Sequence, residues 1–300
     1  MKKIISVISS LVLASGMTSV FAANAADESE NYKPYFYFKA DESSSYEVLK
    51  WGAVYVNRKG AGANAKIPVS IYFKDDEKIA GQIFAKWTCA NKSLQLTDLS
   101  GPVSAKGASP YKVVKTDEDI NLKTFTDLNV MAVSYTDTNV KAPMALTGDT
   151  SDAYPLACFN ASFTADATGG IYEIAMYNNG NFYTSVVPRY VDDITKTIEV
   201  FPAEYSKTLK ISCSDRMLGD VNNDGKINAV DASMILAEYA KVSSNNPTTF
   251  TVDQEMAADI DGNYKYDAVD ASGVLAYYAY TATLSEGATP KTLNQFTKGE

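Results

Sequence analysis

The sequence predicts a mainly β N-terminal module followed by a small α-helical C-terminal domain. Three observations predict it. Short apolar segments separated by turn residues fill residues 26–211, an acidic loop followed by a helical pattern occurs twice in residues 218–282, and hydrophobic residues make up 46% of the 300 positions. A hydrophobic share of this size is typical of a folded globular chain. The length fits one large domain or two ordinary ones.

The first 25 residues have the pattern of a secretory signal peptide. Lys2 and Lys3 precede a short apolar stretch at residues 4–14, and Ala23-Asn24-Ala25 fits the small-residue cleavage rule. The apolar stretch is short for a membrane anchor, because a span takes about 20 residues. We therefore expect a secreted, extracellular chain that starts near Ala26.

Composition excludes several kinds of function. The chain has no histidine, so neither a Ser-His-Asp catalytic group nor a His-ligated zinc site can form. The formal net charge is −9, and an acidic chain repels phosphate backbones, which makes nucleic acid a poor partner. Cys89, Cys158 and Cys213 are an odd number for a disulfide framework. We expect free thiols, with a Cys89–Cys158 bridge left open.

Short strands are expected throughout the N-terminal module, with no long helical pattern between them. They lie at residues 35–38, 47–56, 67–73, 79–89, 94–96, 129–135, 156–163, 171–177, 182–188 and 198–201. This arrangement predicts a β-sandwich over residues 26–211. Alternation along residues 79–89 puts Trp87 on the same side as Ala85 and Cys89, which is an apolar side facing the core.

Part of this module resembles a cohesin in the order of its strands. The strands that open the family's pattern resemble the segments at residues 65–73, 79–81, 83–84 and 94–96. Residues 156–164, a turn at Gly169-Gly170 and residues 171–174 resemble its closing hairpin, whereas residues 103–126 depart from the pattern. The resemblance implies a jelly-roll β-sandwich that binds a dockerin-bearing protein through one flat sheet face.

Two other interpretations of this module stay open. A carbohydrate-binding module is also a β-sandwich, and its sugar-stacking rings would come from Trp51, Trp87, Tyr177, Phe182 and Tyr183, although core or rim positions explain these aromatic residues better. A small glycoside hydrolase needs two carboxylates about 5–9.5 Å apart. The acidic groups at residues 75–77 and 117–119 are better explained as solvated turns, so we expect no enzymatic activity.

Two segments of the C-terminal region align without gaps. The first, DVNNDGKINAVD, begins at Asp220, and the second, DIDGNYKYDAVD, begins at Asp259. Oxygen-bearing residues recur at positions one, three, five, nine and twelve, which is the spacing of a calcium loop, where position seven supplies its carbonyl oxygen. The predicted ligands of two Ca²⁺ ions are Asp220, Asn222, Asp224, Lys226, Asn228 and Asp231 in the first loop, and Asp259, Asp261, Asn263, Lys265, Asp267 and Asp270 in the second.

The two loops differ at position six, where the backbone makes a sharp turn. Gly225 holds that position in the first loop, but Tyr264 holds it in the second. A bulky residue at positive φ costs about 1–2 kcal/mol. Gly262 at position four relieves part of this cost. We therefore expect the second site to bind more weakly or to differ in shape.

A helix is expected after each loop, at residues 234–239 and 274–278, but residues 212–218 are too short and polar for the entering helix of an EF-hand. Duplicated halves of this kind resemble dockerin modules of type I, over residues 218–282. The resemblance implies calcium-dependent binding of a cohesin, with two pseudo-symmetric faces. Carried over by position, the partner-binding residues are Ala229, Val230, Leu236, Ala237 and Lys241, with the duplicates Ala268, Val269, Leu275, Ala276 and Tyr280. Leu236 and Leu275 fit a buried position equally well.

The expected organisation is a signal peptide at residues 1–25, a cohesin-like sandwich at 26–211, a short linker at 212–217, a dockerin at 218–282 and an exposed tail at 283–300. Such a chain resembles an adaptor scaffoldin of a cellulosome, the extracellular complex that degrades plant polysaccharides. The resemblance implies that its dockerin binds a cohesin of a larger scaffoldin, while its own cohesin-like module receives another dockerin.

Overall fold

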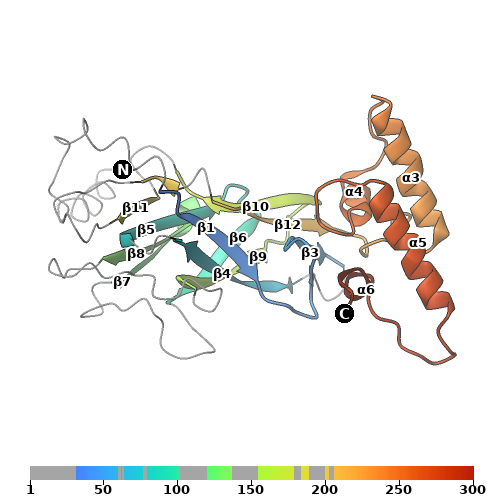
Figure 1. Ribbon diagram of the computed structural model, residues 1–300, viewed down its shortest axis with the longest axis horizontal. Helices are drawn as coiled ribbons and strands as arrows, with labels where there is room; N and C mark the ends of the chain where they lie inside the picture. The colour runs from blue at the N-terminus through green and yellow to red at the C-terminus, as the bar shows by residue number, and fades with distance from the viewer. Residues whose placement is uncertain are drawn as a thin grey trace.

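The computed structural model describes residues 32–59, 62, 64–76, 80–101, 120–136, 155–178, 184–188, 200–202 and 206–300. The predicted signal peptide lies outside the described residues. The molecule is elongated, with a β-sandwich at one end and a helical domain at the other (Figure 1). None of the helices in the described part of the chain is long and apolar enough to cross a membrane.

One sheet of the sandwich has four antiparallel strands. Their order is β1 (Tyr35–Ala40), β4 (Lys66–Lys74), β9 (Ala157–Phe163) and β6 (Leu94–Ser100). Strand β4 shows why the sequence folds this way. Its apolar residues alternate with polar ones, and Ile67, Val69, Ile71 and Phe73 are all buried. A period of two residues buries one face of a strand and exposes the other.

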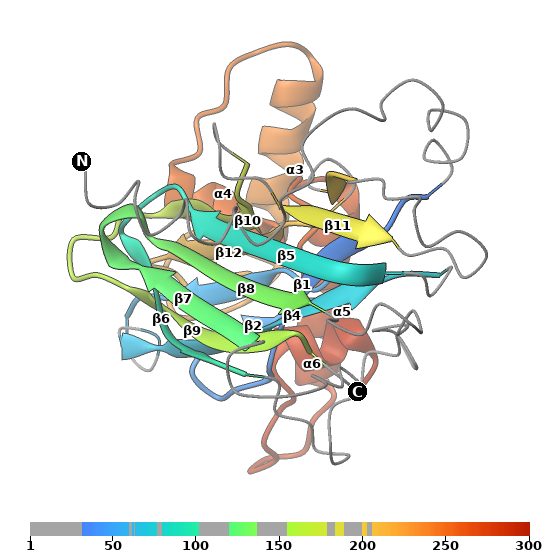
Figure 2. The same ribbon diagram turned by 90° about the vertical axis from the view of Figure 1, so that its left-hand side faces the viewer.

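The second sheet is larger and is mostly antiparallel. Its order is β2 (Glu47–Val48), β3 (Val54–Asn57), β12 (Leu209–Ser214), β10 (Gly170–Met176), β5 (Ala80–Cys89), β8 (Val130–Thr136) and β7 (Ile120–Phe125), and β11 (Ser185–Pro188) pairs with β5 beside this row. Strands β3 and β12 run parallel. A short 3-10 helix, Thr126–Leu128, connects β7 and β8. Strands β7, β8 and β5 lie in front in Figure 2.

The apolar core lies between the two sheets. Trp87 of β5 is fully buried, and its ring lies 5.5 Å from that of Phe159 on the opposite sheet. Ala85 and Cys89 are buried on the same side of β5. The inward side predicted from alternation is therefore confirmed. The three cysteine thiols are free, and Cys89 and Cys158 lie on different sheets.

The strand predicted at residues 47–56 is interrupted by a turn. The Leu49 amide donates to the Ala53 carbonyl at 2.7 Å, and Gly52 has a φ of +83°. This turn separates β2 from β3. Leu49 and Ala53 belong to the apolar cluster shared with the helical domain and not to the core of the sandwich.

One further expectation for the module was wrong, and one strand was missed. Strands β9 and β10 do not form a hairpin, because β9 pairs with β4 and β6 whereas β10 pairs with β12 and β5 in the other sheet. The turn between them carries the chain from one sheet to the other. Strand β12 was not predicted, and it extends to Ser214, into the segment that was expected to be a linker.

The helical domain contains α3 (Ala229–Ser243), α4 (Val252–Ala258), α5 (Ala268–Ala282) and α6 (Leu293–Lys298). Helices α3 and α5 lie side by side at the end far from the sandwich (Figure 1). Helix α4 precedes the second loop, where no helix was predicted. The segment expected to be an exposed tail contains α6, in which Leu293 and Asn294 are buried.

Candidate metal centre and partner-binding surface

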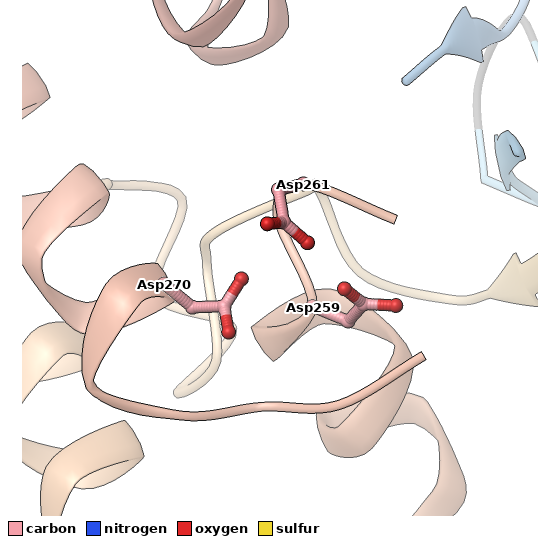
Figure 3. A group of neighbouring side chains, drawn as sticks. All are labelled: Asp259, Asp261 and Asp270. Atoms are coloured by element: carbon pink, nitrogen blue, oxygen red, sulfur yellow. The ribbon is translucent and has the colours of Figure 1, made fainter. Parts of the chain in front are cut away.

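Three carboxylates meet in the second acidic loop. Asp259 follows α4, Asp261 lies two residues further on, and Asp270 comes from the first turn of α5. One oxygen atom of each lies within 4.8 Å of the others (Figure 3). The structure therefore brings together the side chains predicted at positions one, three and twelve of this loop.

The same carboxylates hold the loop backbone in place. Asp259 accepts hydrogen bonds from the amides of Gly262 and Tyr264, at 3.0 and 2.9 Å. Asp270 accepts from the amides of Ile260 and Asp267, at 3.0 and 2.9 Å. Each carboxylate thus fixes the turn around the space that the three acidic groups share.

The first loop repeats this arrangement at matching positions. Asp220 accepts from the Gly225 amide at 2.9 Å. Asp231 accepts from the amides of Val221 and Asn228, each at 3.0 Å. The two copies of the sequence repeat therefore fold into the same local structure.

The ninth and twelfth residues of each loop also begin a helix. Asn228 is the N-cap of α3, and Asp231 completes its capping box from the third helical position. Asp267 and Asp270 do the same for α5. The capping boxes themselves were not predicted, although the Asn/Asp-x-x-Asp spacing resembles a capping-box pattern. The helix starts are therefore coupled to the loops.

Burial makes these carboxylates costly to ionise alone. The pKa of Asp270 is raised to about 7 by burial and by the neighbouring charges of Asp259 and Asp261. The pKa of Asp259 is raised to about 6, again by burial and by Asp261. The pKa of Asp231 is raised by burial as well. Buried carboxylates of like charge favour a bound cation, and an all-oxygen donor set suits calcium, so the residues fit this ion.

The other predicted ligands lie at the rims of the loops. Asn222, Asn228, Asp261, Asn263 and Asp267 are partly buried, whereas Asp224 and the side chains of Lys226 and Lys265 are exposed. An exposed lysine side chain is compatible with the role predicted for these two residues, which is to supply a backbone carbonyl oxygen. Tyr264 has a φ of +68°, so the left-handed turn predicted at this position is present.

The predicted partner-binding residues lie on the surface at matching places of the two helices. Val230 and Val269 are 54% and 64% exposed, and Leu236 and Leu275 are each 41% exposed. The buried alternative for the two leucines is thereby wrong, because Ile235 and Val274 fill the core positions beside them. The alanines at 237, 268 and 276 are exposed, and Ala229 and Lys241 are partly buried.

The two helices differ at their C-terminal ends. The ring of Tyr280 stacks on Phe296 of α6 at 5.2 Å, whereas its duplicate, Lys241, has no such cover among the contacts of the described residues. Further exposed apolar side chains were missed. They are Tyr239 and Val242 on α3 and Tyr278 on α5. Helical spacing could not have identified them, because they follow the buried Ile235 and Val274 by four or seven residues and so fall on the side that the pattern predicts to be buried.

The aromatic and acidic alternatives find little support in the described residues. Trp87 is in the core, Trp51 is 68% exposed on a turn, and Tyr177 is partly buried, so they do not form one platform. Phe182, Tyr183 and residues 117–119 lie outside the described part. Asp75 is buried and accepts a hydrogen bond from the Ala80 amide at 2.9 Å, which is a structural role in a turn.

Comparison with known proteins identifies the helical domain. Residues 218–277 match the family model of the dockerin type I domain, and dockerins of this type bind calcium. No curated protein matches the chain. The span of the family match covers both loops, α3, α4 and most of α5.

The solved structures similar to this chain include cohesins. The seventh ScaB type I cohesin from Pseudobacteroides cellulosolvens is 10% identical, with a TM-score of 0.39, over 60% of this chain and 92% of that chain. A chain of a type I cohesin–dockerin complex from Clostridium thermocellum is 10% identical, with a TM-score of 0.38, over 60% and 99%. The type III cohesin of the ScaE scaffoldin from Ruminococcus flavefaciens is 12% identical, with a TM-score of 0.38, over 65% and 96%. Likeness at this level carries no argument about what the module binds.

The chain carries a dockerin type I domain at residues 218–277, behind a mainly β module whose structural neighbours are cohesins.

Proposed function

We propose that the chain is a secreted, non-catalytic assembly protein of a cellulosome. Its dockerin binds two Ca²⁺ ions and attaches the chain to a cohesin of a larger scaffoldin. Its N-terminal module receives a second, dockerin-bearing protein. The chain then acts as an adaptor in plant polysaccharide degradation, since holding partners on one scaffold raises their effective concentration.

The observation that carries this proposal is the pair of apolar surfaces at matching positions of α3 and α5. Val230 and Leu236 on one helix, and Val269 and Leu275 on the other, expose between 41% and 64% of their surface. Apolar side chains with this much exposed surface, repeated at matching positions of two helices, are available to bind another protein. The sequence repeat supplies two such places.

The loops support a role for calcium in presenting this surface. Bound calcium offsets the repulsion among the buried carboxylates of each loop. Asp231 and Asp270 lie in the first turns of α3 and α5, one residue after Val230 and Val269. The side chains that hold the ion therefore also fix the helix ends that carry the apolar surface.

A capture experiment tests the dockerin part of the proposal. The full chain, loaded with calcium, is immobilised and exposed to a panel of type I cohesins. We expect calcium-dependent capture, lost in EDTA and lost in the double variant Leu236→Asp/Leu275→Asp. The control is Leu128→Asp, which alters a leucine 52% exposed on the sandwich. Equal capture by the double variant, or capture that persists in EDTA, would contradict the proposal.

The N-terminal module needs a separate test. In the double variant Leu236→Asp/Leu275→Asp the proposed cohesin-binding surface is disrupted, so the N-terminal module is the remaining proposed binding site. We expect the variant chain to retain purified dockerin-bearing proteins on a column. Retention of the chain on cellulose, starch or xylan would instead favour a carbohydrate-binding module, and release of sugar from these polymers would favour a glycoside hydrolase.

A further inference from the structure

The helical domain is packed against one end of the sandwich through a shared apolar cluster. Leu49, Ala53 and Tyr55 of the sandwich are almost fully buried, with exposed fractions of 2%, 2% and 1%. They share this cluster with residues of the helical domain, which include Leu218, Val221, Ala258, Ile260, Tyr277 and Leu293. The contact is thus a continuous core and not a flexible joint.

Polar contacts surround this cluster on two sides. On one side, Asp253 of α4 accepts a hydrogen bond from the Asp215 amide at 2.9 Å and lies 3.6 Å from the guanidinium group of Arg58. On the other, the Asn294 side chain of α6 donates to the Val48 carbonyl at 2.9 Å. Both modules therefore contribute charged and polar groups to the contact.

The second acidic loop lies in this contact. Gly262 at position four is buried, with a φ of +79°. A Cβ atom at this position would lie 2.9 Å from the Leu49 Cβ and 3.1 Å from the Ala53 Cβ. The sandwich therefore approaches the loop backbone so closely that only glycine fits without displacement.

Tyr264, at position six of the same loop, reaches back to the sandwich. The Lys210 Nζ of β12 lies 4.2 Å from the centroid of its ring, which is a cation–π contact. Lys210 also pairs with Glu173 of β10 at 3.3 Å. The sandwich thus stabilises a tyrosine that adopts an unfavourable backbone conformation.

The first loop is an internal control, because it has the same fold but shows no contact at these positions with the part of the sandwich that the structure describes. Asn223 holds position four with a φ of +61°, and Gly225 holds position six with a φ of +81°. Both residues are exposed, and a Cβ on Gly225 would meet no atom within 4 Å. Glycine therefore occupies position four in the loop that the sandwich contacts closely, and position six in the loop that is exposed there.

We propose that the second loop is a calcium-dependent latch between the dockerin and the sandwich, in which ion binding inside the loop and docking on its outer side stabilise each other. Gly262 lies between the predicted ligands Asp261 and Asn263, and Tyr264 follows Asn263. The backbone conformation that surrounds the ion is thus the one that the sandwich contacts. Linkage requires the two effects to be reciprocal and equal in size. The inference rests on the proposed calcium binding and is independent of the cohesin partner.

Calorimetric titration of the calcium-free full chain with CaCl₂ tests one direction of this linkage. Ala53→Gln places a bulky neutral side chain against Gly262, outside the core of the sandwich. We expect the affinity of one of the two sites to fall about tenfold while that of the other stays unchanged. The control Trp51→Gln alters the exposed residue of the same turn and should bind calcium like the parent chain. Unchanged affinities in Ala53→Gln would overturn the latch.

Small-angle X-ray scattering tests the opposite direction. In saturating calcium, we expect the radius of gyration of Asp270→Asn to exceed that of the parent chain, and we expect the matched variant Asp231→Asn to stay compact. Equal radii for Asp270→Asn and the parent chain would contradict the latch. Far-ultraviolet circular dichroism shows whether Asp270→Asn keeps its helices. If it has lost them, the scattering of Ala53→Gln is measured instead. A larger radius of gyration than that of the parent chain then supports the latch, and an equal radius contradicts it.

Cohesin capture separates this inference from the proposed function. Helices α3 and α5, which carry the proposed cohesin-binding residues, lie at the end of the molecule far from the sandwich (Figure 1). In saturating calcium, Ala53→Gln should capture a cohesin as well as the parent chain does. Loss of capture in Ala53→Gln alone would show that docking shapes the partner surface, which contradicts a latch confined to the second loop. A parent chain that captures no cohesin would count against the proposed function and not against the latch.

Discussion

Glu47 at the edge of the sandwich has a carboxylate oxygen, Oε2, that is buried without a hydrogen-bond partner in the described structure. Burial raises the pKa of this carboxyl to about 7, helped by the charge of Glu42 and opposed by that of Lys298 on α6. Tyr55 and Tyr277 also lie within reach of its charge. The folded chain thus binds a proton at Glu47 more tightly than the unfolded chain does.

This shift predicts a pH-dependent effect of Glu47→Gln. A raised pKa contributes stability that is complete below the unfolded value of about 4.5 and is lost as the pH rises through about 7. At pH 8 we expect the variant to be more stable than the parent chain by about 1–3 kcal/mol, and at pH 4.5 we expect little difference. Chemical denaturation at both pH values measures this. The exposed Glu286→Gln is the control, and an equal effect of Glu47→Gln at both pH values would contradict the account.

Single residues also show how far the sequence predicts the site. The oxygen donors, their spacing and the left-handed turn at Tyr264 follow from the repeat alone. The contact of Tyr264 with Lys210 does not, because the two residues are far apart in sequence and belong to different modules. The exchange of glycine between positions four and six is visible in the sequence, but its cause, the approach of Leu49 and Ala53, requires the tertiary structure.

At the scale of elements, the start of α3 depends on the residues that complete the first loop. Asp231→Ala removes a predicted ligand, a capping contact and the acceptor of the Val221, Asn222 and Asn228 amides. We expect it to lower the free energy of unfolding by about 3 kcal/mol. Asn228→Ala removes a cap and should cost about 1 kcal/mol. Thermal unfolding in calcium compares them, and equal losses would contradict the role given to Asp231.

Glu238 connects α3 to the segment that leads into α4. Its buried carboxylate accepts hydrogen bonds from the hydroxyl groups of Thr248 and Thr249 and from the Thr249 amide. Burial acts to raise its pKa, but these donors prevail and lower it to about 2. The carboxylate is therefore ionised at neutral pH, where it receives the full stabilisation from its donors.

Replacement of Glu238 should therefore destabilise the helical domain. We expect Glu238→Ala to lower the free energy of unfolding by about 2–3 kcal/mol at pH 7, because it removes the charged acceptor of several part-buried hydrogen bonds from Thr248 and Thr249. Urea denaturation of the calcium-loaded chain measures the loss. The exposed Glu286→Ala serves as the control, and a loss no larger than that of the control would contradict the role of Glu238 as a connector.

Elements were predicted unevenly. Strand β4 was found because its apolar residues alternate with polar ones. Strand β12 was missed although its sequence, LKISCS, alternates in the same way. Helix α4 has only seven residues, and its capping box, Thr251 with Gln254, was the one local signal. Helix α6 was missed because it has few apolar residues. Its position depends on tertiary contacts with α5 and β2, which the sequence does not show.

At the scale of the whole molecule, the dockerin and the sandwich form one packed unit with two separate cores. The larger core contains Trp87, whereas the smaller one is shared by the two modules. Removal of calcium should therefore destabilise the helical domain and the shared core, and leave the core around Trp87 intact. In EDTA we expect helix loss at a lower temperature, ahead of the change in buried tryptophan fluorescence. A single transition at the same temperature with and without calcium would contradict this division.

The central claim is that the duplicated loops bind calcium and thereby organise the dockerin. Calorimetric titration of the calcium-free full chain, followed in parallel by the helical circular dichroism signal, tests it most directly. The account predicts binding of two ions per chain and an increase in helical signal or in thermal stability, with a gain of about 2.7 kcal/mol for each site at 100 times its dissociation constant. Absence of binding heat, together with helices that form and melt identically in EDTA, would contradict it.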